Sequence, residues 1–180
     1  KQKLIDKYYE HGYRDAQILE DSVSNYDGKH VDIYLKVDEG KQYFLRNVTW
    51  VGNTVYSTDY LSALLGMKKG DVYNQKLLHK RLNEDEDAVG NLYYNNGYVF
   101  SNINPAEVNI DGDSIDLEMR VTEGPQAYLS HIRINGNTRL YENVVRRELR
   151  TKPGDLFSKD AVMRSVRELA SMGHFDPEKM

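Results

Sequence analysis

The amino-acid sequence contains a motif that occurs twice, and this repeat restricts the possible folds more than any other feature. An alternating segment ending in Gly-Asn-Thr occupies residues 48–54 and again 132–138, so that Gly52 recurs as Gly136, an offset of 136 − 52 = 84 residues. Three dipeptides recur at the same offset: Asp27-Gly28 as Asp111-Gly112, Glu39-Gly40 as Glu123-Gly124, and Gly70-Asp71 as Gly154-Asp155. Self-similarity at a fixed offset is typical of tandem copies of one small unit. We therefore interpret the chain as repeats of a single domain type.

The middle copy predicts how each unit begins. Within residues 44–51, Phe44, Val48 and Trp50 share one parity, and Arg46 places a charge among them. Alternation of this kind over a short segment is typical of a strand that buries one face. We expect a first strand whose Phe44, Val48 and Trp50 face the core.

Two helices are predicted after this strand. Ser57 offers the N-cap of a short first helix, because its hydroxyl can accept a hydrogen bond from a free backbone N–H, and Gly66 ends that helix. A second helix begins at Asn74 and continues to Gly97 along an apolar stripe that Asp85 interrupts.

A hairpin closes the copy. Residues 107–110 precede the Asp111-Gly112 turn, and residues 115–121 then alternate apolar odd positions with charged even ones. A strand, an Asp-Gly turn and an alternating strand indicate a β-hairpin. We predict an α+β fold of tandem β-α-α-β-β domains, each a three-stranded mixed sheet covered on one face by two helices.

The flanking copies are incomplete in complementary ways. Residues 1–40 contain the second helix and the hairpin, residues 41–124 a complete domain, and residues 125–180 a first strand around Ile132 and Ile134 followed by two helices. We take these ranges as the domain boundaries and expect the chain to be an excerpt from a longer array. Apolar faces at its two ends would lack their covers, which predicts weak, concentration-dependent self-association.

Further motifs recur in order across the copies. The second helix ends in Tyr-Tyr-x-x-Gly-Tyr at residues 8–13 and 93–98, a Val-x-Glu-Gly exit follows each hairpin, and the third copy adds Pro153-Gly154-Asp155. Together with the Gly-Asn-Thr and Gly-Asp motifs, this order resembles the polypeptide-transport-associated (POTRA) domains of the BamA family of outer-membrane assembly factors. The resemblance covers essentially the whole chain.

The resemblance implies a function. It implies a non-enzymatic, periplasmic polypeptide-binding scaffold of an outer-membrane assembly machine, which handles nascent outer-membrane proteins and docks accessory lipoproteins. It also implies a C-terminal β-barrel of the same protein, beyond Met180. The alternatives are the POTRA array of a related translocation or two-partner secretion transporter, and a non-catalytic array for adhesion or cell-wall binding.

A sheet edge is the candidate binding site. An edge strand presents unpaired backbone N–H and C=O groups, which another strand can join irrespective of its sequence. We expect the first strand of each hairpin to be such an edge and to bind unfolded polypeptides by β-augmentation; the alternative is that these edges are short and inert. The candidate residues are Glu107, Val108, Asn109 and Ile110, with Val23, Ser24 and Asn25 as the equivalent edge in the first copy.

The third copy also collects basic residues. Arg139, Arg146, Arg147 and Arg150 form a candidate patch for a partner protein or for lipid headgroups. Salt bridges to neighbouring glutamates on the helix surface explain these arginines equally well.

Other chemistries lack support in the sequence. The net charge of −4 argues against nucleic-acid binding, which needs a concentrated basic face. The five histidines are scattered without metal-ligand spacing, and no nucleophile elbow or phosphate-binding loop occurs. The carboxylates of residues 84–87 are expected on consecutive helical positions, which point in different directions and cannot pair for acid–base work. We therefore predict no catalytic residues, no bound metal and no cofactor.

Overall fold

The structure, a computed structural model, describes residues 1–136 and 140–173. The chain divides into two compact units. The first comprises Lys1–Ala88 and Ile103–Val121, and the second comprises Val89–Asn102 and Thr122–Met180. The chain contains both α-helices and β-strands, so the predicted α+β class is confirmed.

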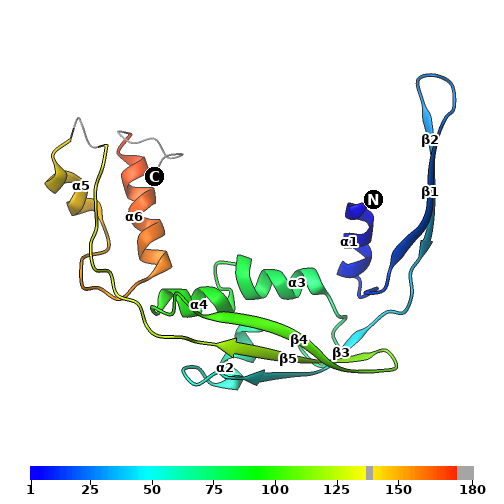
Figure 1. Ribbon diagram of the computed structural model, residues 1–180, viewed down its shortest axis with the longest axis horizontal. Helices are drawn as coiled ribbons and strands as arrows, with labels where there is room; N and C mark the ends of the chain where they lie inside the picture. Colours follow the sequence, from blue (N-terminus) through cyan, green and yellow to red (C-terminus); the bar gives the residue numbers. More distant parts are fainter. Residues whose placement is uncertain (137–139, 174–180) are drawn as a thin grey trace. The chain divides into compact units, whose positions relative to one another are not determined.

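The first unit contains a three-stranded mixed sheet (Figure 1). Its strands are β3 (Phe44–Val51), β4 (Asn102–Asp111) and β5 (Ser114–Thr122), in the order β3-β5-β4. Strands β3 and β5 are parallel. Only residues 112–113 separate β4 from its neighbour β5, and so short a connection permits only an antiparallel pair. The mixed sheet is therefore as predicted.

Strand β5 provides the largest share of the sheet's buried face. Its burial alternates residue by residue, as its sequence predicts, with charged side chains on the opposite face. The buried members are Ile115, Leu117, Met119 and Val121.

Strand β3 departs from the predicted alternation. Its register against β5 shifts around Arg46, which has no partner residue and forms a β-bulge. Leu45 is consequently buried together with Trp50, whereas Phe44 and Val48 are only half-buried. The expectation that Phe44 faces the core with Trp50 is wrong, because one extra residue reverses the faces of the side chains before it.

Helix α2 (Thr58–Leu65) begins and ends as predicted. Ser57 is its N-cap, and Gly66 closes it in the left-handed region with φ 71°. The Trp50 indole Nε1 donates a hydrogen bond of 2.9 Å to Ser62 Oγ, which attaches the helix to β3.

The predicted second helix is broken. It begins after the expected N-cap, Asn74, as α3 (Gln75–His79) and continues as a π-helical turn, η1 (Lys80–Glu84). Asp85 is extended, with ψ 151°, and a separate helix, α4 (Val89–Asn95), follows the turn. The polar residue that interrupts the apolar stripe is thus where the helix ends.

The expectation that residues 84–87 all lie on a helix is also wrong. Only its first residue is helical, and the others lie in the turn. Arg81 lies against this turn, with Nη1 at 3.2 Å from Asp85 Oδ2 and 2.8 Å from Asp87 Oδ1. The same guanidinium donates to the backbone carbonyls of Leu64 and Leu65 at the end of α2.

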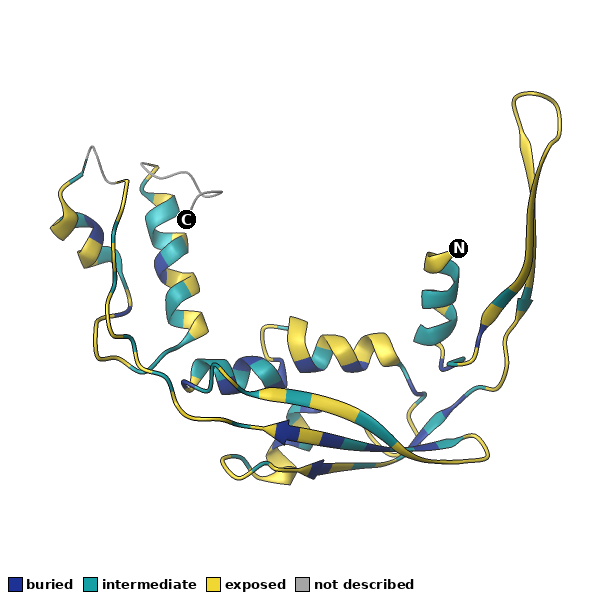
Figure 2. Cartoon of the chain, in the orientation of Figure 1, coloured by how far each residue is buried: buried dark blue, intermediate teal, exposed yellow. Residues whose placement is uncertain are grey.

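The first unit also contains helix α1 (Gln2–Glu10) and a hairpin of β1 (Gln17–Asn25) and β2 (Val31–Asp38), with the turn at the predicted Asp27-Gly28. This antiparallel hairpin is a separate two-stranded sheet. Figure 2 shows it almost entirely as exposed residues, whereas β5 carries buried ones.

The second unit contains α4, α5 (Glu142–Glu148) and α6 (Lys159–Ser171). Ser158 caps α6 as predicted, by accepting a hydrogen bond from the backbone N–H of Ala161. Helices α4 and α6 are joined by a 2.7 Å hydrogen bond from Lys159 Nζ to Asn91 Oδ1.

The predicted first strand of the third copy does not form. Residues 131–136 have no assigned secondary structure, and Tyr128 makes only an isolated bridge with Leu156. The described residues of this copy include no hairpin for that segment to pair with. Among the helices within residues 1–136 and 140–173, none is long and apolar enough to cross a membrane.

Candidate functional site

The candidate edge is the outer strand of the three-stranded sheet. Strand β4 has β5 on one side, and no described strand lies on its other side. It begins at Asn102, five positions before the predicted start at Glu107, and includes Pro105. Proline has no backbone N–H to donate to a ladder, so its presence fits an edge strand.

The predicted edge residues divide into two groups. Val108 and Ile110 keep 48% and 44% of their surface exposed, and Asn109 is exposed as well. Glu107 is instead held from both sides of its carboxylate: Arg14 Nη1 lies 2.9 Å from Oε2, and the Tyr73 hydroxyl donates to Oε1 at 2.7 Å. The accessible part of the predicted edge is therefore 108–110.

The two side chains that bind the Glu107 carboxylate come from distant parts of the chain. Arg14 follows helix α1 of the first copy and also lies over the Tyr43 ring, 5.7 Å from its centroid. The Tyr43 hydroxyl donates to Asp15 Oδ2 at 2.7 Å. Hydrogen bonding to Asp15 raises the pKa of Tyr43, and burial followed by the bond to Glu107 raises that of Tyr73. Both hydroxyls therefore remain donors at neutral pH.

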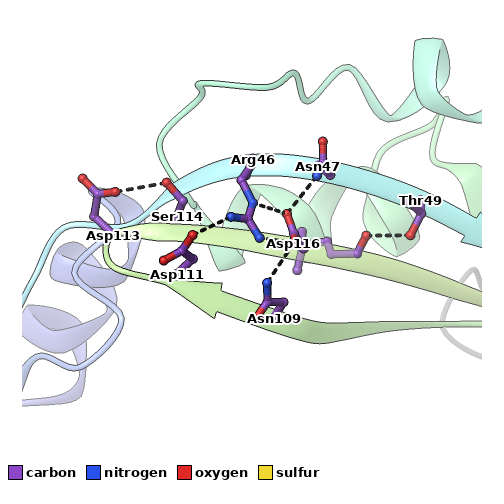
Figure 3. Close-up of polar contacts among 9 residues, drawn as sticks. Arg46, Asn47, Thr49, Asn109, Asp111, Asp113, Ser114 and Asp116 are labelled. Atoms are coloured by element: carbon purple, nitrogen blue, oxygen red, sulfur yellow. Dashed lines mark hydrogen bonds and ion pairs between the residues drawn. The ribbon is translucent and has the colours of Figure 1, made fainter.

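A polar network joins all three strands on the sheet face that carries Asp116 (Figure 3). Arg46 donates from Nε and Nη2 to the two oxygens of Asp116 on β5, at 2.9 and 2.6 Å, and from Nη1 to Asp111 Oδ2 on β4, at 2.9 Å. Asn47 of β3 and Asn109 of β4 donate to the same Asp116 carboxylate, at 3.1 and 3.5 Å. These contacts tie the end of β4 to the far edge strand.

This network sets the charge state of its central carboxylate. The hydrogen bonds from Arg46 lower the pKa of Asp116 to about 2, against a usual 3.8, and Asp116 in turn raises the pKa of Arg46. A bidentate guanidinium–carboxylate pair is among the stronger polar contacts in proteins. The pair is ionised throughout the physiological pH range.

The equivalent edge in the first copy lies at the end of β1. Val23, Ser24 and Asn25 pair with Ile33, Asp32 and Val31 of β2, and no described strand occupies the opposite side of β1. Asn25 Oδ1 also accepts from the Gly28 N–H at 2.8 Å, which fixes the hairpin turn.

The junction from one copy to the next is built twice with the same hydrogen bonds. In the first unit, the Tyr43 N–H donates to Gly12 O at 2.9 Å; in the second, the Ala127 N–H donates to Gly97 O at 2.8 Å. Each junction also has a tyrosine that donates to the glutamate of a Glu-Gly pair, in Tyr8–Glu39 at 2.8 Å and Tyr93–Glu123 at 3.0 Å. The sequence repeat thus includes the connection between copies.

The predicted arginine patch consists of ion-paired side chains where it is described. Arg146 pairs with Glu142, Arg147 with Glu148, and Arg150 with Glu168 through both carboxylate oxygens, at 2.9 and 3.0 Å from Nε. Arg139 lies outside the described residues. A partner for this patch stays a prediction.

The described residues contain no group of three or more histidine, aspartate or glutamate side chains arranged to hold a metal ion. Sequence reasoning missed two contributors to the edge, Arg14 and Arg46. The paired charges of Arg46 and Asp116, on strands expected in one sheet, could have suggested the second. No local pattern connects Arg14 with Glu107, because they belong to different copies.

The fold and its edge define a class of protein: a tandem array of small α+β domains with open sheet edges. The family profile of POTRA, described as surface antigen variable number repeat, matches residues 43–124 and 127–179, and the chain belongs to this family.

Curated relatives and a solved structure agree with this assignment. A protein of Treponema pallidum is 30% identical over 95% of this chain, and "Outer membrane protein assembly factor BamA" of Neisseria meningitidis is 29% identical over 97%. The chain spans about a fifth of these relatives, 21% and 22% of their lengths. The crystal structure of Haemophilus influenzae BamA POTRA3-5 superimposes with a TM-score of 0.76 at 25% identity, covering 97% of this chain and 68% of that one. The predicted resemblance is confirmed.

Proposed function

We propose that the chain is a periplasmic scaffold of outer-membrane protein assembly, which binds unfolded outer-membrane proteins through the free edge of β4. Its similarity to proteins named BamA supports the assembly role. The proposed binding mode is supported by the position of β4 at the edge of the sheet and by its exposed segment at 108–110.

The edge favours clients of a particular chemistry. Asn109 and Asp111 reach the polar network around Asp116, so they lie on the charged face of the sheet. Val108 and Ile110 alternate with them and lie on the opposite, apolar face. A strand added beside β4 continues both faces and is therefore best matched by alternating apolar and polar residues. Strands of outer-membrane barrels have this alternation.

Nuclear magnetic resonance tests this proposal. A peptide of about ten alternating residues, the length of a barrel strand, is added to the isotopically labelled 180-residue chain. We expect amide shifts at 108–110 and none along α2. The same peptide methylated at every backbone nitrogen has no N–H to donate to a strand and should give no shifts. Equal shifts with both peptides, or none at β4 with either, would rule out β-augmentation at this edge.

A matched pair of variants tests the location. Val108→Lys places a charge on β4, which is how exposed edges are commonly blocked, and should weaken peptide binding at least about tenfold. Val51→Lys makes the same change at a similarly exposed valine of β3, the other edge strand, and should leave the affinity unchanged. Equal losses in both variants would indicate a general effect of charge.

Docking of accessory lipoproteins is the second part of the proposal. Arg146, Arg147 and Arg150 are its candidate residues, and a partner carboxylate would replace an internal one at each. Such an exchange predicts weak, salt-sensitive binding. Loss of lipoprotein capture in the triple alanine variant, with α5 retained by circular dichroism, would support it; unchanged capture would contradict it.

A further inference from the structure

The exposed part of β4 is interrupted near the centre of the strand. Residues 104–105 and 108–111 are exposed, whereas residues 106–107 between them are partly buried. The whole strand has 10 residues, which is about the length of a strand in an outer-membrane barrel. A client strand that used all of β4 would therefore have to pair across the interruption.

The first copy contacts β4 at this interruption. The Arg14 guanidinium lies 2.9 Å from the Glu107 carboxylate, and the two side chains keep only 29% and 19% of their surface exposed. Arg14 is supported from behind by the Tyr43 ring, and the second oxygen of the carboxylate accepts a hydrogen bond from Tyr73. Partial removal from water strengthens an ion pair relative to one on the open surface. Glu107 is thus held by a residue of the preceding copy.

Other contacts hold the same junction away from β4. Lys76 Nζ on α3 lies 2.7 Å from Glu10 Oε1 on α1, and the Tyr43 N–H donates to Gly12 O at 2.9 Å. Loss of Arg14 therefore leaves contacts that still join the two copies. The Arg14–Glu107 pair differs from these in that one of its members belongs to the edge strand.

We propose that the Arg14–Glu107 pair is an autoinhibitory contact, which limits a client to short pairing at 108–110 and which a client strand must displace to pair along the whole of β4. The inference rests on the proposed binding of clients to this edge. A paired strand places the Cβ of the residue opposite Glu107 at about 4.5–5.5 Å, so its side chain competes with Arg14 for the space beside the carboxylate.

This competition links client binding to the junction between copies. If release of Arg14 raises the affinity for a long strand by some factor, a bound long strand must weaken the Arg14–Glu107 contact by the same factor. A short strand that pairs only with 108–110 leaves the contact intact. The edge therefore distinguishes client strands by their length, and a long client loosens the attachment of the first copy.

Peptides of two lengths test this proposal. Capped, uncharged peptides of alternating valine and threonine, about four and about ten residues long, are titrated into the labelled 180-residue chain while the amide signals of β4 are followed. In Arg14→Ala, the dissociation constant of the longer peptide should fall about fivefold or more, and that of the shorter peptide should stay the same. Lys76→Ala removes an ion pair of the same junction away from β4 and should leave both constants unchanged.

Hydrogen exchange tests the reciprocal effect. The Tyr43 amide, which donates to Gly12 across the junction, should exchange faster when the parent chain is saturated with the longer peptide, but not with the shorter one. Added salt screens the ion pair, so it should strengthen binding of the longer, uncharged peptide more in the parent than in Arg14→Ala.

The outcomes separate this inference from the proposed function. An unchanged affinity of the longer peptide in Arg14→Ala, or an equal gain for both lengths, would overturn the autoinhibitory contact and leave binding at the edge in place. A gain in Lys76→Ala as large as that in Arg14→Ala would also overturn it, because any loosening of the junction would then suffice. No amide shifts at β4 with either peptide would overturn both the contact and the edge as a binding site.

Discussion

Arg46 illustrates how one side chain can organise a sheet face. It is the unpaired residue of a bulge, and its guanidinium reaches both Asp116 and Asp111 on the charged face of the sheet. The edge strand β4 is thereby linked to β3 across β5. A polar residue that interrupts an apolar pattern here indicates a specific contact and not merely a tolerated substitution.

The Asp116–Arg46 pair predicts an acid-dependent loss of stability. Because the folded-state pKa of Asp116 is about 2 and its usual value is 3.8, the carboxylate stabilises the fold fully above pH 3.8, and this contribution is lost as the pH falls through about 2. In Arg46→Gln, the pKa of Asp116 should rise toward its usual value. Carbon-13 titration of the Asp116 carboxyl in both proteins measures this; an unchanged midpoint in the variant would show that Arg46 is not the cause.

Glu107 shows that a polar contact can limit a binding surface. Arg14 and Tyr73 hold its carboxylate at hydrogen-bond distance, so the accessible part of the predicted edge 107–110 begins at Val108. In Arg14→Ala, we expect peptide-induced amide shifts to extend from 108–110 to Glu107 and Ala106. Lys7→Ala, which removes another cation of the first copy, should leave the range of shifts unchanged. Identical shift ranges in the parent and Arg14→Ala would contradict this limit.

At the level of elements, the helix α3–η1 depends on Arg81. Its guanidinium donates to the last carbonyls of α2 and pairs with Asp85 and Asp87 beyond η1. Helix ends leave carbonyl groups without internal partners, and a charged donor that satisfies them stabilises the packing of both helices.

Arg81→Met should therefore lower the free energy of unfolding. It keeps an apolar stem but removes the donors from partly buried carbonyls, a loss of about 1–3 kcal/mol. Lys80→Met removes a more exposed cation of the same turn and should change stability by less than about 0.5 kcal/mol. Urea unfolding of the three proteins gives both values. A similar loss for both variants would assign the effect to net charge.

At the level of the whole molecule, the repeated unit includes the junction between copies. Gly12 and Gly97 occupy equivalent positions with φ 84° in both, and a Cβ at either would lie 2.5 Å from a side chain, of Val72 or of Leu156. Both glycines accept a hydrogen bond that connects one copy to the next. Left-handed backbone and close packing together explain why glycine is required at each.

Replacing either glycine with alanine should destabilise only the junction in which that glycine lies. We expect a cost of about 1–3 kcal/mol for each, from left-handed backbone and the clash. Hydrogen exchange should accelerate at the Tyr43 amide in Gly12→Ala and at the Ala127 amide in Gly97→Ala, because these amides donate across the respective junctions. Faster exchange at both amides in either single variant would mean that the junctions are coupled.

The sequence by itself determined the repeat, the α+β class, the caps at Ser57, Asn74 and Ser158, and the buried face of β5. These features follow from local rules: periodicity over a few residues, hydroxyl or amide capping groups, and glycine at chain reversals. The resemblance to the POTRA family was also evident from motifs in sequence order.

The tertiary structure alone decided three features: the bulge at Arg46, the failure of residues 131–136 to form a strand, and the ion pair by which Arg14 binds the Glu107 carboxylate. Each depends on residues distant in sequence: β5 sets the register of β3, the described residues of the third copy include no hairpin to pair with 131–136, and Arg14 of one copy binds the carboxylate of Glu107 on the edge strand of the next. A strand pattern specifies which face is apolar, but backbone hydrogen bonds form only where a neighbouring strand is present.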